Sequence, residues 1–205
     1  VVIIFAILAG LLLPLSPVMI LWVNLITAIA LGLALAFEPT EPGTMRRPPR
    51  SRDEPLLNAG LLWQVVLVSG LFAAAVFGVF LYATDRGYPL PLAQTMAMNT
   101  LVVLEVFYLF FVRNLHGTSL TWAGVRGTPV VWSCVIGVAL AQLGITYLPP
   151  LQEAFGTRAV PVPDGLVILA VGAVFFALVE TEKQMRLALR PRGSRVGAGP
   201  GAGRS

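Results

Sequence analysis

Charged residues are scarce in this sequence. Only 12% of its 205 residues are Asp, Glu, Lys or Arg, whereas a soluble globular domain carries about 25%. Apolar residues make up 57% of the chain and stand in long uninterrupted runs. A helix of about 20 such residues crosses the hydrocarbon core of a bilayer. The composition therefore excludes an ordinary water-soluble fold and predicts an integral membrane protein.

Cysteine and histidine are almost absent. The single cysteine, Cys134, lies inside an apolar run, so the sequence excludes a disulfide framework. The single histidine, His116, lies in a polar segment. The sequence also lacks a metal-spaced His and Cys cluster, a Gly-rich phosphate loop and a nucleophile beside a base. We therefore predict that the chain carries no catalytic residue and binds no cofactor of its own.

Six apolar runs are predicted to span the membrane as helices. Polar, proline-rich or turn-forming segments separate them. The runs are Val1–Leu15, Val18–Phe37, Leu61–Ala83, Ala93–Val112, Pro129–Leu148 and Gly165–Val179. The last run is short for a bilayer, although Glu180 and Lys183 could snorkel to its surface from a helix that continues toward Arg190. The predicted fold class is an all-α polytopic bundle of six transmembrane helices.

The chain divides into two regions. Residues 1–188 are predicted to form the transmembrane domain, and residues 189–205 a disordered basic tail rich in Gly and Arg. The first run is apolar from its first residue, with no basic segment before it and no small-residue cleavage site after it, so it is not a signal peptide. We expect that the sequence begins inside a helix of a longer protein.

Positive charge is unevenly distributed between the loops. Of the 14 Lys and Arg residues, only Arg86 and Arg158 fall in loops on one side, and the other 12 fall in the loops or tail on the opposite side. Because cytoplasmic loops retain Lys and Arg, we predict a carboxyl terminus in the cytoplasm and a location in the plasma membrane. The arginines form no basic face with interleaved aromatic rings, so nucleic-acid binding is excluded.

Glu105 is the one ionisable residue near the middle of a predicted span. A charge at this depth costs about 2.5 to 3.5 kcal/mol, so it persists only where it has a partner or a task. Two interpretations are open. The carboxylate either faces the bundle interior as a cation ligand or proton carrier, or it is a protonated acid that forms a hydrogen bond with a neighbouring helix.

Asn24 and Thr27 are three residues apart and share one face of the second predicted span. Their amide and hydroxyl oxygens could ligate a hard cation. Taken alone, however, such residues in a membrane helix more often join helices through hydrogen bonds. The same structural role is predicted for Asn99, Thr100 and Gln142.

Two segments resemble a known family of ion pumps. Residues 17–37 read PVMILWVNLITAIALGLALAF and are followed by Glu38 and Pro39 and by the loop MRRPPRSRDEPLL. Residues 95–114 read TMAMNTLVVLEVFYLFFVRN. In this order and spacing, the two segments resemble the carboxyl-terminal half of type II cation-transporting P-type ATPases, the class of the calcium and sodium pumps. The expected parent is a bacterial pump.

The resemblance implies that the six spans are helices five to ten of such a pump. It also implies that Asn24 and Thr27 in the sixth helix, and Glu105 in the eighth, donate oxygen ligands to the transported cation. Ala28 stands where the calcium and sodium pumps have an aspartate that ligates ions. The cation is therefore left unassigned among calcium, magnesium, sodium, potassium and the proton.

The resemblance further implies partners outside this sequence. The phosphorylation, nucleotide-binding and actuator domains of the family have no motif here, so ATP and magnesium belong to the intact pump. The expected partners are the lipid bilayer, the amino-terminal half of the pump and an inorganic cation. Two alternatives stay open, namely a stand-alone six-helix transporter in which Glu105 relays protons, and a non-transporting scaffold subunit that binds another membrane protein.

Overall fold

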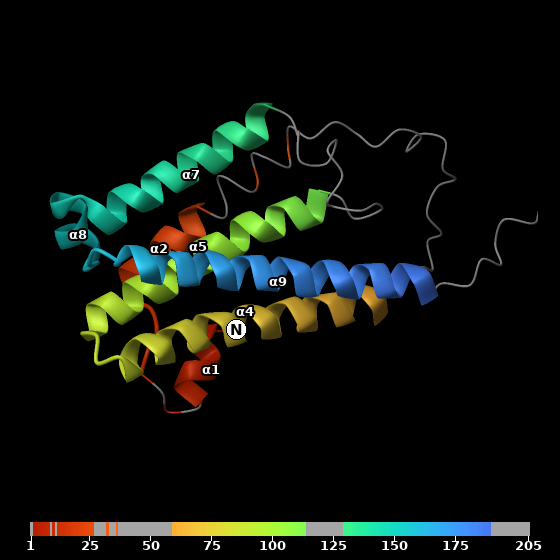
Figure 1. The fold of residues 1–205 in the computed structure, drawn as a ribbon, viewed down its shortest axis with the longest axis horizontal. Coiled ribbons are helices and arrows are strands. Elements are labelled where there is room, and N and C mark those ends of the chain that lie inside the picture. Colours follow the sequence, from red (N-terminus) through yellow and green to blue (C-terminus); the bar gives the residue numbers. More distant parts are fainter. Residues whose placement is uncertain are drawn as a thin grey trace, which may run out of the picture.

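The computed structural model describes residues 2–8, 10, 12–26, 32, 36, 59–113 and 129–189. Within them all regular structure is α-helical, which confirms the predicted all-α class (Figure 1). In chain order the helices are α1 (Val2–Leu8), α2 (Pro17–Ile26), α4 (Ala59–Asp85), α5 (Leu90–Arg113), α7 (Pro129–Tyr147), α8 (Pro149–Phe155) and α9 (Val162–Leu189).

Four of the described helices, α4, α5, α7 and α9, are long and apolar enough to cross a membrane. They correspond to the third to sixth predicted spans. Large apolar side chains cover the outside of these helices, among them Leu62, Val66, Leu140, Leu169 and Leu178. A continuous outer surface of this kind suits lipid and not water. The first two predicted spans are described only as far as α1 and α2, and most of residues 27–58 lie outside the described residues.

Helix α5 is the centre of the bundle. In its most apolar stretch 56% of the residues are buried, whereas the figure is 28% in each of α4, α7 and α9. Figure 1 shows α9 lying along α5 and α4, with α7 on the other side of α5. Met96, Met98 and Leu104 of α5 are completely buried. A polar side chain on α5 is therefore more often in contact with another helix than exposed to lipid.

Helix α9 approaches α5 closely at Gly172. A Cβ atom on this residue would lie 2.6 Å from Cγ1 of Val103 and 2.8 Å from the ring of Phe107. The Phe107 ring also packs against Phe176 with a centroid distance of 6.0 Å. Only glycine leaves room for this contact. The sequence did not single out Gly172 because its neighbours come from a distant part of the chain.

The last transmembrane helix continues toward Arg190 as expected, but its charged residues are buried. Helix α9 continues past Val179 to Leu189, and Glu180 and Lys183 do not snorkel to the surface. Both side chains are buried, and Nζ of Lys183 lies 2.7 Å from Oε2 of Glu180. The same ammonium lies 4.9 Å from the ring centroid of Phe111 on α5. The two charges compensate one another inside the bundle, which allows the helix to continue.

Helix α2 starts at the same end of the bundle as α5. Its first residue is Pro17, and Oγ of the preceding Ser16 accepts a hydrogen bond from the N–H of Met19 at 3.3 Å, a usual helix start. Nε2 of Gln94, in the first turns of α5, donates to the carbonyl oxygen of Leu13 at 3.0 Å. The two helices therefore run in the same direction, as Figure 1 also shows.

The α4–α5 turn is held against the start of α9 by Asp164. This carboxylate is 1% exposed and accepts hydrogen bonds from the hydroxyls of Tyr82, at 3.2 Å, and Tyr88, at 3.0 Å. Nη1 of Arg86 lies 3.5 Å from Oδ1 of the same carboxylate. A hydrogen bond with Tyr88 raises the pKa of the Arg86 guanidinium, which keeps its positive charge. We call this group the Asp164 clamp.

Candidate cation site and the polar residues around it

Glu105 faces the interior of the bundle. It lies in the middle of the central helix α5, and its side chain is half-buried. Together with Ile26 of α2 and with Cys134 and Val138 of α7, it lines a small cavity of about 10 Å³. This volume is close to the least that holds one water molecule. The carboxylate therefore stands at a junction of three helices, beside a space of the size of a small ion or a water.

The structure does not place the other two predicted ligands, Asn24 and Thr27, at this cavity. Helix α2 buries Met19, Val23 and Ile26 and exposes Asn24. Two residues correspond to about 200° around an α-helix, so Asn24 and Ile26 point in nearly opposite directions. Thr27 lies outside the described residues. The part of the chain that the structure describes also holds no group of three or more His, Cys, Asp or Glu side chains placed to bind a metal ion.

Asn99 and Gln142 join three helices through hydrogen bonds, which confirms the structural role predicted for them. Nε2 of Gln142 on α7 donates to Oδ1 of Asn99 on α5 at 2.5 Å, and Nε1 of Trp22 on α2 donates to Oε1 of Gln142 at 2.9 Å. The hydroxyl of Thr146 on α7 also lies 3.1 Å from Oδ1 of Asn99. Thr100 differs from the prediction, because its hydroxyl donates within α5, to the carbonyl of Met96.

Two members of this network were not predicted. Trp22 and Thr146 were passed over because both lie in apolar runs and neither is ionisable. A usable signal was present for Trp22, since an indole N–H in an apolar environment needs an acceptor. No comparable signal existed for Thr146, whose hydroxyl can also donate to the carbonyl of Gln142 one turn earlier.

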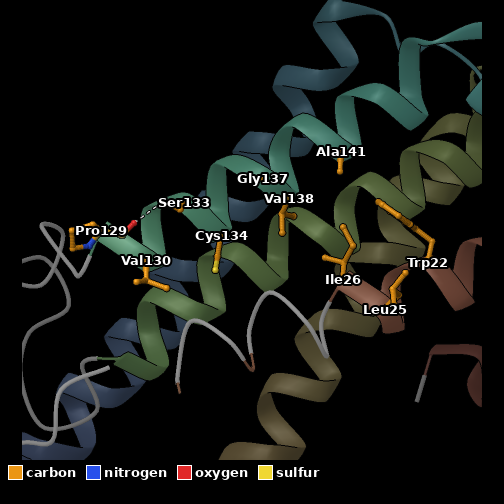
Figure 2. A pocket seen from close by; sticks show the side chains of 10 residues that line it. All are labelled: Trp22, Leu25, Ile26, Pro129, Val130, Ser133, Cys134, Gly137, Val138 and Ala141. Atoms are coloured by element: carbon orange, nitrogen blue, oxygen red, sulfur yellow. Dashed lines mark hydrogen bonds between the residues drawn. The ribbon is translucent and has the colours of Figure 1, made fainter. Parts of the chain in front are cut away.

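An apolar groove of about 580 Å³ lies between α2 and α7 (Figure 2). Its lining consists of Trp22, Leu25, Ile26, Pro129, Val130, Ser133, Cys134, Gly137, Val138 and Ala141. The hydroxyl of Ser133 donates to the carbonyl of Pro129 on its own helix at 2.9 Å, the dashed line in Figure 2. The groove thus presents mostly hydrocarbon and is a poor environment for a cation.

The described helices form a bundle of the membrane-protein class, with an ionisable carboxylate on the central helix. Residues 12–185 match the family described as "Cation transporting ATPase, C-terminus". The chain belongs to this family and is the carboxyl-terminal membrane domain of a cation-transporting P-type ATPase. The resemblance noted in the sequence is confirmed.

Among its relatives is the probable cation-transporting ATPase F of Mycobacterium tuberculosis, which is 42% identical over 182 residues, 88% of this chain and 20% of that protein. The cation-transporting ATPase pma1 of Synechocystis is 35% identical over 160 residues, 76% of this chain and 18% of that protein. The calcium-transporting ATPase of Bacillus subtilis is 33% identical over 174 residues, 84% of this chain and 19% of that protein. The chain thus spans about a fifth of the length of these relatives.

Proposed function

We propose that this chain forms part of the intramembrane cation site of an ATP-driven pump, with Glu105 as its carboxylate ligand and Asn24 and Thr27 as further ligands. Asn24 points away from the Glu105 cavity in this structure, so α2 would have to turn in the cation-bound pump to bring it to the site. The observation that carries the proposal is the position of Glu105, on the central helix and beside a small cavity where three helices meet. Carboxylate, amide and hydroxyl oxygens are the ligands that hard cations prefer. The family membership of the chain supports the same role.

In the intact pump, phosphorylation of a soluble domain by ATP and magnesium would change the access and affinity of this site. The cation would then bind on one side of the membrane and leave on the other, because each conformation binds it with a different affinity. One relative is named a calcium-transporting ATPase, so calcium is the first cation to test. Ala28 in place of an aspartate makes magnesium, sodium, potassium and the proton necessary comparisons.

The proposed topology has six spans, which are helices five to ten of the pump. The pump would lie in the plasma membrane, with the carboxyl terminus of this chain in the cytoplasm. The proposal takes α1 and α2 as parts of two further spans beside the four long helices. The excess of Lys and Arg in the loops on one side supports the orientation. Residues 1–188 would form the membrane domain and residues 189–205 a basic tail.

Transport by the intact pump in inside-out membrane vesicles tests the site. In transport assays with each of these cations, Glu105→Gln and Asn24→Ala should raise the cation concentration for half-maximal transport by about tenfold or more. Glu105→Gln removes the negative charge and one carboxylate oxygen, and Asn24→Ala removes the amide oxygen. Thr181→Ala is a matched control, since the Thr181 hydroxyl is exposed and donates to Ala177 on its own helix.

Full transport of every tested cation by both variants would contradict the site assignment. Proton movement through liposomes that contain only this chain, without ATP, would instead favour the stand-alone transporter. In that case Glu105→Gln should abolish the movement.

A further inference from the structure

A chain of hydrogen bonds crosses the bundle from α2 to α5 by way of α7. The indole N–H of Trp22 donates to Oε1 of Gln142 at 2.9 Å, and Nε2 of Gln142 donates to Oδ1 of Asn99. Gln142 is 8% exposed and therefore lies inside the protein. We call the three side chains of Trp22, Gln142 and Asn99 the amide bridge. Figure 2 shows the Trp22 side chain on α2 facing α7.

The donor and the acceptor of each hydrogen bond in the amide bridge are determined by Trp22. An indole N–H can only donate, so the Gln142 atom beside it must be the carbonyl oxygen. The amide nitrogen of Gln142 then points to Asn99, and the Asn99 atom that receives it must be an oxygen. The hydroxyl of Thr146 can donate either to Oδ1 of Asn99, at 3.1 Å, or to the carbonyl of Gln142, at 2.8 Å. Each amide oxygen of the bridge receives an N–H group from another helix, so the bridge joins the three helices.

The amide bridge lies next to the proposed cation ligands on both helices that it joins. On α2, Asn24 follows Trp22 by two residues. On α5, Glu105 follows Asn99 by six residues, about 9 Å along the helix axis. Since α2 and α5 run in the same direction, Asn24 and Glu105 both lie beyond the bridge toward the same end of the bundle.

We propose that Gln142 is a positioning residue for the cation site. It holds α2 at a fixed height and distance relative to α5, and so fixes the cavity that Ile26 of α2 and Glu105 of α5 line together. Gln142 itself would not touch the cation. This inference rests on the proposed function, and it adds a residue on a third helix, α7, that tunes the affinity of the site.

The test is transport by the intact pump with Gln142→Met and Trp22→Phe. Methionine fills a volume similar to that of glutamine but lacks its amide donor and acceptor. Phenylalanine lacks the indole N–H but keeps an aromatic ring next to Phe155, whose ring centroid lies 5.5 Å from that of Trp22. For Gln142→Met we expect the half-maximal cation concentration to rise about tenfold, as for other residues that orient metal ligands, with a maximal rate within about twofold of the unmodified pump. Trp22→Phe should act in the same direction. Ser133→Ala, on the same helix, is the matched control.

The double variant sharpens the test. Trp22 and Gln142 act in series, so combining the two substitutions should raise the half-maximal concentration no further than Gln142→Met alone. A lower maximal rate or protein yield with an unchanged half-maximal concentration would overturn the proposal, as would no change in either. Glu105→Gln, measured beside them, separates the two proposals. If it raises the half-maximal concentration and Gln142→Met does not, the site stands and the positioning role fails; if it has no effect on any cation, the proposed function fails first.

Discussion

At the scale of single residues, helix contact inside this bundle depends on side-chain volume. Gly172 lets α9 approach α5, where Val103 and Phe107 would be only 2.6 and 2.8 Å from an added Cβ atom. Valine has a stiff side chain that cannot move away easily. Other glycines in the same bundle have space around them, and an added Cβ on Gly78 of α4 meets nothing within 4 Å. The two glycines therefore have different roles.

Replacing Gly172 with alanine should destabilise the bundle by about 1 to 3 kcal/mol, because the new methyl group overpacks the α5–α9 contact. Gly78→Ala should be neutral or stabilise the bundle by about 0.5 to 1 kcal/mol, because alanine favours a helix interior. Equilibrium unfolding of the purified chain in mixed detergent micelles measures both. Equal stability of the two variants would mean that the close α5–α9 contact does not form.

At the scale of helices, carboxylates near both ends of α9 form hydrogen bonds with α4 and with the α4–α5 turn. Near its start, the buried Asp164 receives two tyrosine hydroxyls and a guanidinium from the α4–α5 turn, and an acidic residue in the first turn also suits the helix dipole. Near its end, Glu182 accepts hydrogen bonds from Trp63 of α4 and from Arg186. Arg186 in turn donates to the carbonyl of Gly60. These contacts hold α9 against α4 near both ends of α9.

We expect Asp164→Asn to lower the melting temperature of the chain in detergent by about 5 °C, because the charge-assisted bonds of the Asp164 clamp are lost. Asp85→Asn is the control, since Asp85 is an exposed aspartate at the end of α4 close to the same turn. A smaller shift for Asp164→Asn than for Asp85→Asn would show that the clamp does not stabilise the junction of α9 with the α4–α5 turn.

At the scale of the whole molecule, the bundle has two ends that are expected to face opposite sides of the membrane. The Asp164 clamp and Arg158 lie at one end, where α4 meets α5 and where α9 begins. The end of α9 lies at the other (Figure 1). From the positive-inside rule we expect this second end to face the cytoplasm.

Reporter fusions test the orientation. Green fluorescent protein fused after Ser205 should fluoresce, and alkaline phosphatase at the same site should be inactive, because the carboxyl terminus is expected in the cytoplasm. Alkaline phosphatase fused after Arg158 should be active, because this loop is expected on the outer side. The reverse pattern at either site would contradict the six-span topology.

Much of the fold could be predicted from the sequence, because the length of an apolar run and the side on which charge is retained are local properties. The long helices α4, α5 and α7 begin and end close to the predicted spans. The prediction was wrong for Glu180 and Lys183, which were expected to snorkel to the surface, because the ion pair between them and the packing of Lys183 against Phe111 of α5 depend on how the helices pack. The resemblance to a family of pumps was also accessible, because its motifs are contiguous.

The sequence by itself therefore determined the membrane-embedded helical class of this protein, its family and the candidate role of Glu105, since a carboxylate in an apolar run is visible without coordinates. Only the tertiary structure decided which side chains meet. Trp22 and Gln142 are 120 residues apart in the chain, and Asn99 and Gln142 are 43 apart. Hydrogen bonds and close contacts act over a few ångströms, so such pairs depend on how the helices pack and not on the order of the residues.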